Sequence, residues 1–151
     1  MFLVILAVGY VGSRGGSGGG SSSDGYDESG YSESALAELS RAVTVNRLQD
    51  PWVPGSAGVV AASGRRLVAL EVTVEGPRGC DTPVYVSPMS FKLTDSDGYA
   101  YAAFKSEGAR PPLATISLKA GEKTRGWLTF EVDESTRVSS VSYRGVDLKL
   151  P

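Results

Sequence analysis

Alternation of apolar and polar side chains is the feature that most restricts how this 151-residue chain can fold. The segment 66–75 places valine or leucine at every second position from 68 to 74, and the segment 124–132 does the same with Leu128, Phe130 and Val132. Side chains two residues apart point to the same side of a strand, so each segment predicts a β-strand with one apolar face and one wet face. Because no stretch of ten or more residues keeps apolar side chains at helical spacing, we expect the chain from residue 41 onward to be all-β.

Turn-forming residues separate the alternating segments and set the number of expected strands. Gly, Pro and Asp interrupt the pattern at intervals typical of two antiparallel sheets whose inner faces meet across about 10 Å. We therefore predict an antiparallel β-sandwich of seven to eight strands. The expected strands are Ala42 to Leu48, Arg66 to Glu75, Val84 to Ser87, Phe91 to Thr94, Tyr99 to Phe104, Thr115 to Leu118, Thr124 to Val132 and Val138 to Tyr143, with Val146 to Leu150 as a further candidate.

The amino-terminal segment is expected to lie outside the sandwich. Residues 1–13 are uncharged and mostly apolar, but twelve helical residues span only about 18 Å, less than the roughly 30 Å hydrocarbon core of a membrane. We predict an apolar signal or anchor segment, with a buried strand of the domain as the alternative. An upstream start, which would supply the Lys or Arg that usually precedes such a run, stays open. No cysteine follows this run, which excludes lipid modification of the lipoprotein kind as the sequence stands.

Residues 14–40 form a second segment of distinct composition, rich in Gly, Ser and acidic side chains. Such a segment cannot bury enough apolar surface to fold alone, and it predicts a flexible linker with a reach of about 25 Å. Residues 41–151 are then the folded domain.

Histidine is absent and Cys80 is the single cysteine, which excludes several classes of chemistry. Ser-His-Asp and Cys-His nucleophile pairs cannot be built, nor can zinc sites with imidazole and thiolate ligands. Residues 41–151 carry 14 basic and 12 acidic side chains without clustering, so a nucleic-acid partner is not expected. Cys80 cannot form an intrachain disulfide, and two interpretations stay open: a small, partly buried loop residue, or a thiol that pairs between chains.

The run Asp95-Ser96-Asp97-Gly98 is the only stretch that suggests a metal site, because alternate carboxylates are ligands that calcium prefers. An EF-hand would need a glutamate at the twelfth position from Asp95, where Ser106 stands. A hairpin turn with positive φ at Gly98 explains the same residues, and we favour it. We predict no metal site and no cofactor.

Aromatic side chains are the main candidates for ligand binding. Trp127 falls on the polar side of its strand, and Trp52, Tyr99 and Tyr101 are also expected to be partly exposed. We predict Trp127, Tyr99 and Tyr101 as binding residues that stack on a sugar or a peptide. The alternative, which we favour for Trp127, places this side chain under a loop or over the sheet edge.

Charged side chains offer two weaker candidates. The pairs Arg65-Arg66 and Lys123 with Arg125 could contact an anionic polymer, but such pairs usually flank strands in solvent. Carboxylates are numerous, yet no pair stands in a recognisable glycosidase context. We therefore predict that the protein is not an enzyme.

Three blocks together carry a family resemblance: the strand 66–74, the segment from Val86 to Tyr101, and Leu118 to Lys123 followed by Gly126 to Val132. Their order and spacing resemble the telokin-like, immunoglobulin-fold domain of secreted proteins and lipoproteins of bacteria and archaea. The resemblance implies an immunoglobulin-like sandwich outside the cytoplasm and no catalytic residues.

These observations predict a non-catalytic binding module, secreted or tethered at the cell envelope through the amino-terminal apolar segment, whose partner is a protein or an envelope polymer. A structural spacer of the envelope is the alternative, and a carboxylate-based hydrolase is a third, less favoured one. A binding module would present a contiguous exposed patch, a spacer an evenly polar surface, and a hydrolase a cleft with converging acids.

Overall fold

The computed structural model describes residues 37–38, 41–55, 59–78, 82–103 and 108–151. The predicted signal or anchor segment, most of the predicted linker, and Cys80 lie outside these residues. Among the described residues, no helix has the length and apolar character needed to span a membrane. The regular elements are the strands β1 (Val43–Gln49), β2 (Arg65–Glu75), β3 (Val84–Val86), β4 (Phe91–Asp95), β5 (Ala100–Ala102), β6 (Ile116–Leu118), β7 (Lys123–Asp133), β8 (Val138–Tyr143) and β9 (Val146–Leu148), with the 3-10 turn η1 (Pro88–Ser90) before β4.

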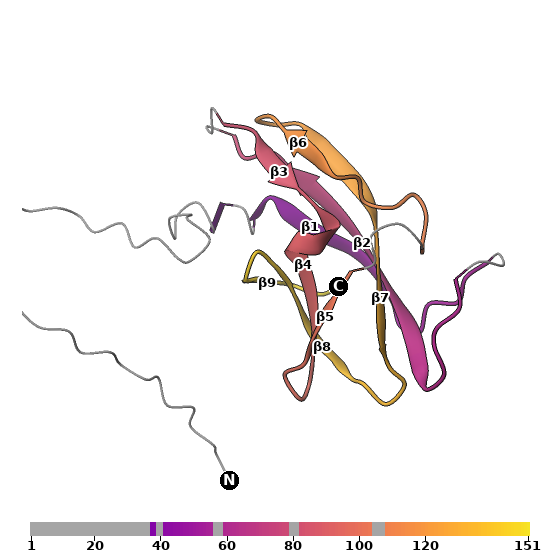
Figure 1. Cartoon of the computed structure of the whole chain (residues 1–151). Helices are drawn as coiled ribbons and strands as arrows, with labels where there is room; N and C mark the ends of the chain where they lie inside the picture. The colour runs from indigo at the N-terminus through magenta and orange to yellow at the C-terminus, as the bar shows by residue number, and fades with distance from the viewer. Residues whose placement is uncertain (1–36, 39–40, 56–58, 79–81, 104–107) are drawn as a thin grey trace, which may run out of the picture.

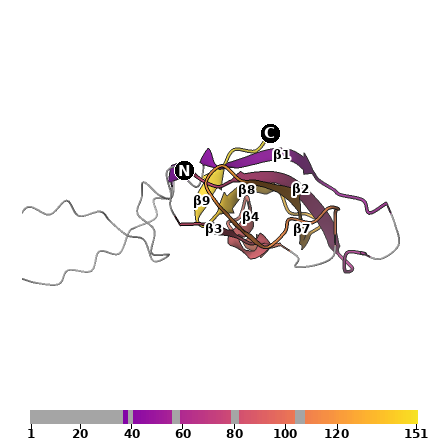
Figure 2. The same cartoon turned by 90° about the horizontal axis from the view of Figure 1, so that it is seen from above.

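Every strand pair in these sheets is antiparallel. One sheet has the order β1-β2-β7, a second has the order β5-β4-β8-β9, and β3 pairs with β6 in a short ribbon. In Figure 1 the long strands β2 and β7 run side by side, with β4, β8 and β9 against them, and Figure 2 shows the same arrangement from above. The predicted all-β antiparallel sandwich is confirmed.

The inner faces of the sheets supply the core. Alternate residues of β2 and β7 face inward, and Val72 and Phe130 are fully buried, as the alternation predicts. Each such side chain contributes about 1.5–3 kcal/mol before conformational entropy is subtracted. The fully buried side chains of largest volume are Tyr143, Phe91, Phe130, Leu70, Leu93, Leu128, Val68, Val72, Val74, Val86, Val132 and Val141.

The described residues contain nine strands, where we expected seven to eight. The additional strand is β9, at the position of the further candidate 146–150. Four strands, β3, β5, β6 and β9, have only three residues each.

The outward face of β2 and β7 differs from expectation, since only part of it is wet. Leu67 and Ala69 stand on the side predicted to face solvent, yet they are 4% and 0% exposed, and Thr129 opposite Ala69 is 2% exposed. Loop segments cover this part of the sheet: the Trp52 N–H donates to the Leu67 carbonyl (2.7 Å), and the Ala109 N–H donates to Thr129 Oγ1 (3.0 Å). The prediction of one fully wet face is therefore wrong for this half of the strands.

Candidate functional site

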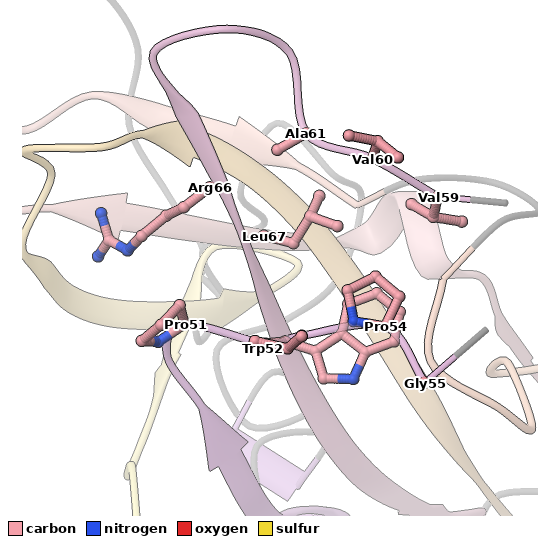
Figure 3. Close-up of a pocket in the computed structure, with 10 residues that line it drawn as sticks. Pro51, Trp52, Pro54, Gly55, Val59, Val60, Ala61, Arg66 and Leu67 are labelled. Carbon is pink, nitrogen blue, oxygen red and sulfur yellow. The ribbon is translucent and has the colours of Figure 1, made fainter. Parts of the chain in front are cut away.

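An apolar hollow of about 510 Å³ lies on the outward face of the first sheet, where β2 begins. Its walls are the two arms of the connection between β1 and β2, residues 51–55 and 59–61, and Leu67 forms its floor (Figure 3). We call this site the loop hollow. Small-molecule and side-chain sites usually have this size and apolar character. The residues that form its apolar walls include Trp52, Val53, Pro54, Val59, Val60 and Ala61.

Backbone and side-chain hydrogen bonds hold the two arms on the sheet. The Trp52 N–H donates to the Leu67 carbonyl, which attaches the first arm to β2. The second arm ends at Ala62, whose N–H donates to Glu131 Oε1 of β7 (2.7 Å) and whose carbonyl accepts from the Arg65 N–H (2.9 Å). Gly64, with φ of +77°, closes that turn, a conformation that favours glycine. The arms therefore lie on either side of β2 with the hollow between them.

Arg66 is the single charged residue among the lining residues, and its donors are fully used. Nε and Nη2 donate to the two carboxylate oxygens of Asp50 (2.7 and 2.9 Å), and Nη1 and Nη2 donate to the carbonyls of Asp133, Glu134 and Thr136 at 2.8–2.9 Å. A guanidinium has five N–H groups, so none is left for a ligand. The hydrogen bonds to Asp50 raise the pKa of Arg66 above its ordinary value, and the group stays charged.

The hollow also exposes apolar side chains to solvent. Val53 and Val60, one on each arm, are 78% and 89% exposed, the highest values among the large hydrophobic residues that the structure describes. With Arg66 saturated and no free charge in the lining, the chemistry of the loop hollow fits an uncharged apolar group.

Trp127 lies on the other, charged half of the same outward face. It stands opposite Glu71, is partly buried, and belongs to the strand edge that the segment 111–113 covers. The Trp127 N–H donates to the Pro111 carbonyl and the Trp127 carbonyl accepts from the Leu113 N–H, both at 2.9 Å. The edge beside Trp127 is thus covered by a loop segment.

Ion pairs dominate this half. Arg125 binds Glu71 through two hydrogen bonds of 3.0 and 2.8 Å, and these lower the pKa of the Glu71 carboxyl. Lys123 pairs with Glu75 (Nζ to Oε2, 2.9 Å). At the opposite end of β2, Arg65 pairs with Asp133 (Nε to Oδ1, 3.3 Å). The basic pairs that we considered as anchors for an anionic polymer therefore contact carboxylates of the domain itself.

Tyr99 and Tyr101 lie in the other sheet, so the three predicted binding residues are not brought together. Tyr101 stands opposite the buried Leu93 and packs against the core, with its hydroxyl 3.0 Å from Asp95 Oδ2 and 3.2 Å from Thr136 Oγ1. Tyr99 is 69% exposed at the hairpin between β4 and β5. Of the three, only Tyr99 presents most of its side chain to solvent.

The Asp95–Gly98 run forms the expected hairpin turn. Asp95 Oδ1 accepts the N–H groups of Asp97 (3.0 Å) and Tyr99 (2.8 Å), and Gly98 has φ of +89°. Burial raises the pKa of Asp95, but these hydrogen bonds and that of Tyr101 outweigh it, and the net pKa is lowered. In the described part of the chain, no three Cys, Asp or Glu side chains gather in a way that could hold a metal ion.

Among the residues of the loop hollow, sequence reasoning considered Trp52 as an exposed aromatic and Arg66 as a contact for an anionic polymer. The signal that could have found the others is composition, since residues 51–63 contain no charged side chain although they connect two strands. Connections on a protein surface are usually polar, and an apolar one of this length indicates a covered or binding surface.

Two solved structures resemble the fold. A secreted protein of Mycobacterium tuberculosis, MPT63, has a TM-score of 0.50 and 19% sequence identity, over 70% of this chain and 77% of that chain. A "putative lipoprotein (ycdA)" of Bacillus subtilis subsp. subtilis str. 168 has a TM-score of 0.51 and 19% identity, over 67% of this chain but only 30% of that longer chain. At this identity the likeness concerns the fold alone.

None of the curated proteins matches this chain. The sequence does match a protein family over residues 37–148, which includes all nine strands of the sandwich. The chain therefore belongs to the family described as Domain of unknown function (DUF4352).

Proposed function

We propose that this chain is an extracytoplasmic, non-catalytic binding module of immunoglobulin-like type, which holds an apolar side chain of another protein in the loop hollow. The single observation that carries the proposal is the hollow itself: an apolar hollow walled by Trp52, with Val53 and Val60 exposed, on a sheet face whose other half carries ion pairs. Exposed apolar surface of this kind is costly in a monomer and marks interaction sites.

Two observations support a place outside the cytoplasm. The sequence of residues 1–13 suits a signal or anchor segment, and that of residues 14–40 suits a tether. The two similar structures are described as a secreted protein and a "putative lipoprotein", which agrees with export. The telokin-like character suggested by the sequence blocks belongs to the same proposal.

Two other functions compete with this one. A spacer domain would use none of its surfaces, and the uneven distribution of apolar side chains favours binding over that role. Stacking of a sugar on Trp127 is a second binding mode, favoured by the neighbouring Glu71 and Arg125, whose polar groups could bind hydroxyls. Trp127 is only partly exposed and Val53 and Val60 are mostly exposed, so we place the ligand at the loop hollow.

The test is selection of peptides from a random library by the full chain. We expect enriched sequences with an apolar residue at a constant position, whose binding falls at least about tenfold in the variant V53D/V60D, because two carboxylates would line the hollow. Met89, which is 58% exposed outside the hollow, supplies the matched control M89D, and this variant should bind normally. Failure to enrich any sequence, or equal binding to V53D/V60D, would overturn the proposal.

A further inference from the structure

We infer that the partner segment carries basic residues beside the apolar side chain that enters the loop hollow; this inference rests on the proposed function. It comes from the charge of the end of the sandwich that holds the hollow. β1 and β7 end there, β2 begins there, and the turns after β4 and β7 meet there through the Ser96 N–H, which donates to the Arg137 carbonyl (2.9 Å).

Carboxylates outnumber basic groups at this end by six to three. The acidic side chains come from the ends of β1, β4 and β7 and from the two turns, and Arg66 itself touches the turn after β7 through the carbonyls of Asp133 and Glu134. The carboxylates are Asp50, Asp95, Asp97, Glu131, Asp133 and Glu134, and the basic side chains are Arg65, Arg66 and Arg137.

Two of the three basic groups are neutralised within the domain. Arg66 pairs with Asp50 and Arg65 pairs with Asp133. Glu134 and Asp97 are exposed and take part in no ion pair among the described residues. Arg137 alone opposes them, so this end of the sandwich keeps a negative excess.

The remainder of the described domain from residue 41 onward has the opposite sign. Four carboxylates there face ten basic side chains, which gives the molecule an acidic end and a basic body. Screening at 0.1 M salt has a length of about 10 Å, so a ligand at the hollow responds more to the acidic end that holds it than to the basic body. The basic side chains of that body are Arg41, Arg47, Arg78, Lys92, Arg110, Lys119, Lys123, Arg125, Arg144 and Lys149, and its acids are Glu71, Glu75, Glu122 and Asp147.

This arrangement selects among apolar partners. The acidic end would repel anionic lipid headgroups, whereas it would attract lysine or arginine beside an apolar residue. A basic, apolar peptide segment is the occupant that fits the charge of this end.

Three peptide libraries with one design test this inference. Each has three central positions drawn from Pro, Leu, Val and Phe, with two flanking residues on either side that are all Lys, all Ser or all Glu. Against the full chain at low salt, we expect the Lys-flanked library to bind roughly tenfold more tightly than the Glu-flanked one, with Ser between them. The preference should shrink in high salt and in the variant D97N/E134Q, whereas D147N, which removes an exposed carboxylate of β9, should keep it.

Each outcome separates the two proposals. Equal binding of all three libraries, lost in V53D/V60D, would overturn the charge inference and leave the loop hollow as the site. Absence of binding that depends on the hollow would remove both. Phosphatidylcholine–phosphatidylglycerol vesicles are the remaining probe: binding of these vesicles by the full chain that V53D/V60D abolishes would overturn the peptide in favour of a membrane. Vesicle binding that is unchanged in V53D/V60D, together with the Lys preference, would support the peptide.

Discussion

The outward face of β2 has two halves with the same alternation of side chains but with different surroundings. At the start of the strand, Leu67 and Ala69 are buried beneath loop segments, and next to them lies the loop hollow. Toward its end, Glu71 and Glu75 form ion pairs with Arg125 and Lys123. The difference teaches that alternation decides which side of a strand a residue occupies, whereas the neighbouring connections decide whether that side meets water.

The cause of the difference is the connection that enters β2. Residues 50–64 form a long link between β1 and β2, and both of its arms are hydrogen-bonded to the sheet, at Leu67 and at Glu131. The connection that leaves β2 contributes a charged contact instead, the ion pair of Arg78 with the outward Glu75 (Nη2 to Oε1, 3.5 Å). The loop hollow and the charged half therefore lie on the same strand and differ because different connections adjoin them.

The largest expected effect concerns removal of buried side chains on the two faces. Phe130→Ala, on the inner face, should lower the free energy of unfolding by about 3–5 kcal/mol, and Leu67→Ala, under the loops, by about 2–4 kcal/mol. Thr73→Ala, on the charged half of the outward face, should cost less than about 1 kcal/mol. Urea denaturation measures all three. A cost for Leu67→Ala as small as that for Thr73→Ala would abolish the distinction between the halves.

A smaller effect tests how closely a loop segment packs on β7. A Cβ added to Gly126 would lie 2.4 Å from Leu113 Cα and 2.6 Å from Leu113 N, which are backbone atoms that cannot move independently. Gly126→Ala should therefore cost about 1–3 kcal/mol of unfolding free energy. Gly55→Ala is the matched control, because nothing lies within 4 Å of the added atom. Thermal denaturation that shows equal stability of the two variants would mean that residues 111–113 do not cover this edge.

The smallest effect concerns the charged half and its response to acid. Arg125 lowers the pKa of Glu71 below 4.5, so the ionised carboxyl favours the folded state. This stabilisation is complete above pH 4.5 and is lost as the pH falls through the lower, folded pKa. Glu71→Gln should thus lose less stability than the wild type between about pH 5 and about pH 3. Asp147→Asn is the control for removal of an exposed acid; an identical acid response in Glu71→Gln and the wild type would contradict the ion pair.

Part of this architecture could be predicted from the sequence because it depends on residues close together in the chain. The inward positions of Val72 and Phe130 follow from alternation over eleven-residue strands, and the turn at Gly98 follows from Asp-Gly between two strands. The orientation of Tyr101 is harder to predict, because β5 has only three residues. The pairing of Tyr101 with Leu93 in β4 determines that its side chain points inward.

The remainder depends on contacts between residues far apart in the chain. The sequence predicts Arg66 as a solvent-exposed residue at the end of a strand, but its partners include three backbone carbonyls 67 to 70 residues away. Every residue has a backbone carbonyl, so no residue type in the sequence indicates these partners. The burial of Ala69 and Thr129 likewise depends on loops that approach from elsewhere. The alternation of apolar and polar residues therefore does not predict the loop hollow. The one signal in the sequence is the uncharged composition of the connection between β1 and β2.

The most direct measurement is a two-dimensional NMR titration of the 15N-labelled full chain with a selected peptide. The chain has two tryptophans, and their indole N–H signals report on the two halves of the outward face separately. We predict that the Trp52 signal moves with saturation while the Trp127 signal stays in place. Movement of Trp127 with a stationary Trp52 would place the ligand on the charged half and contradict the account.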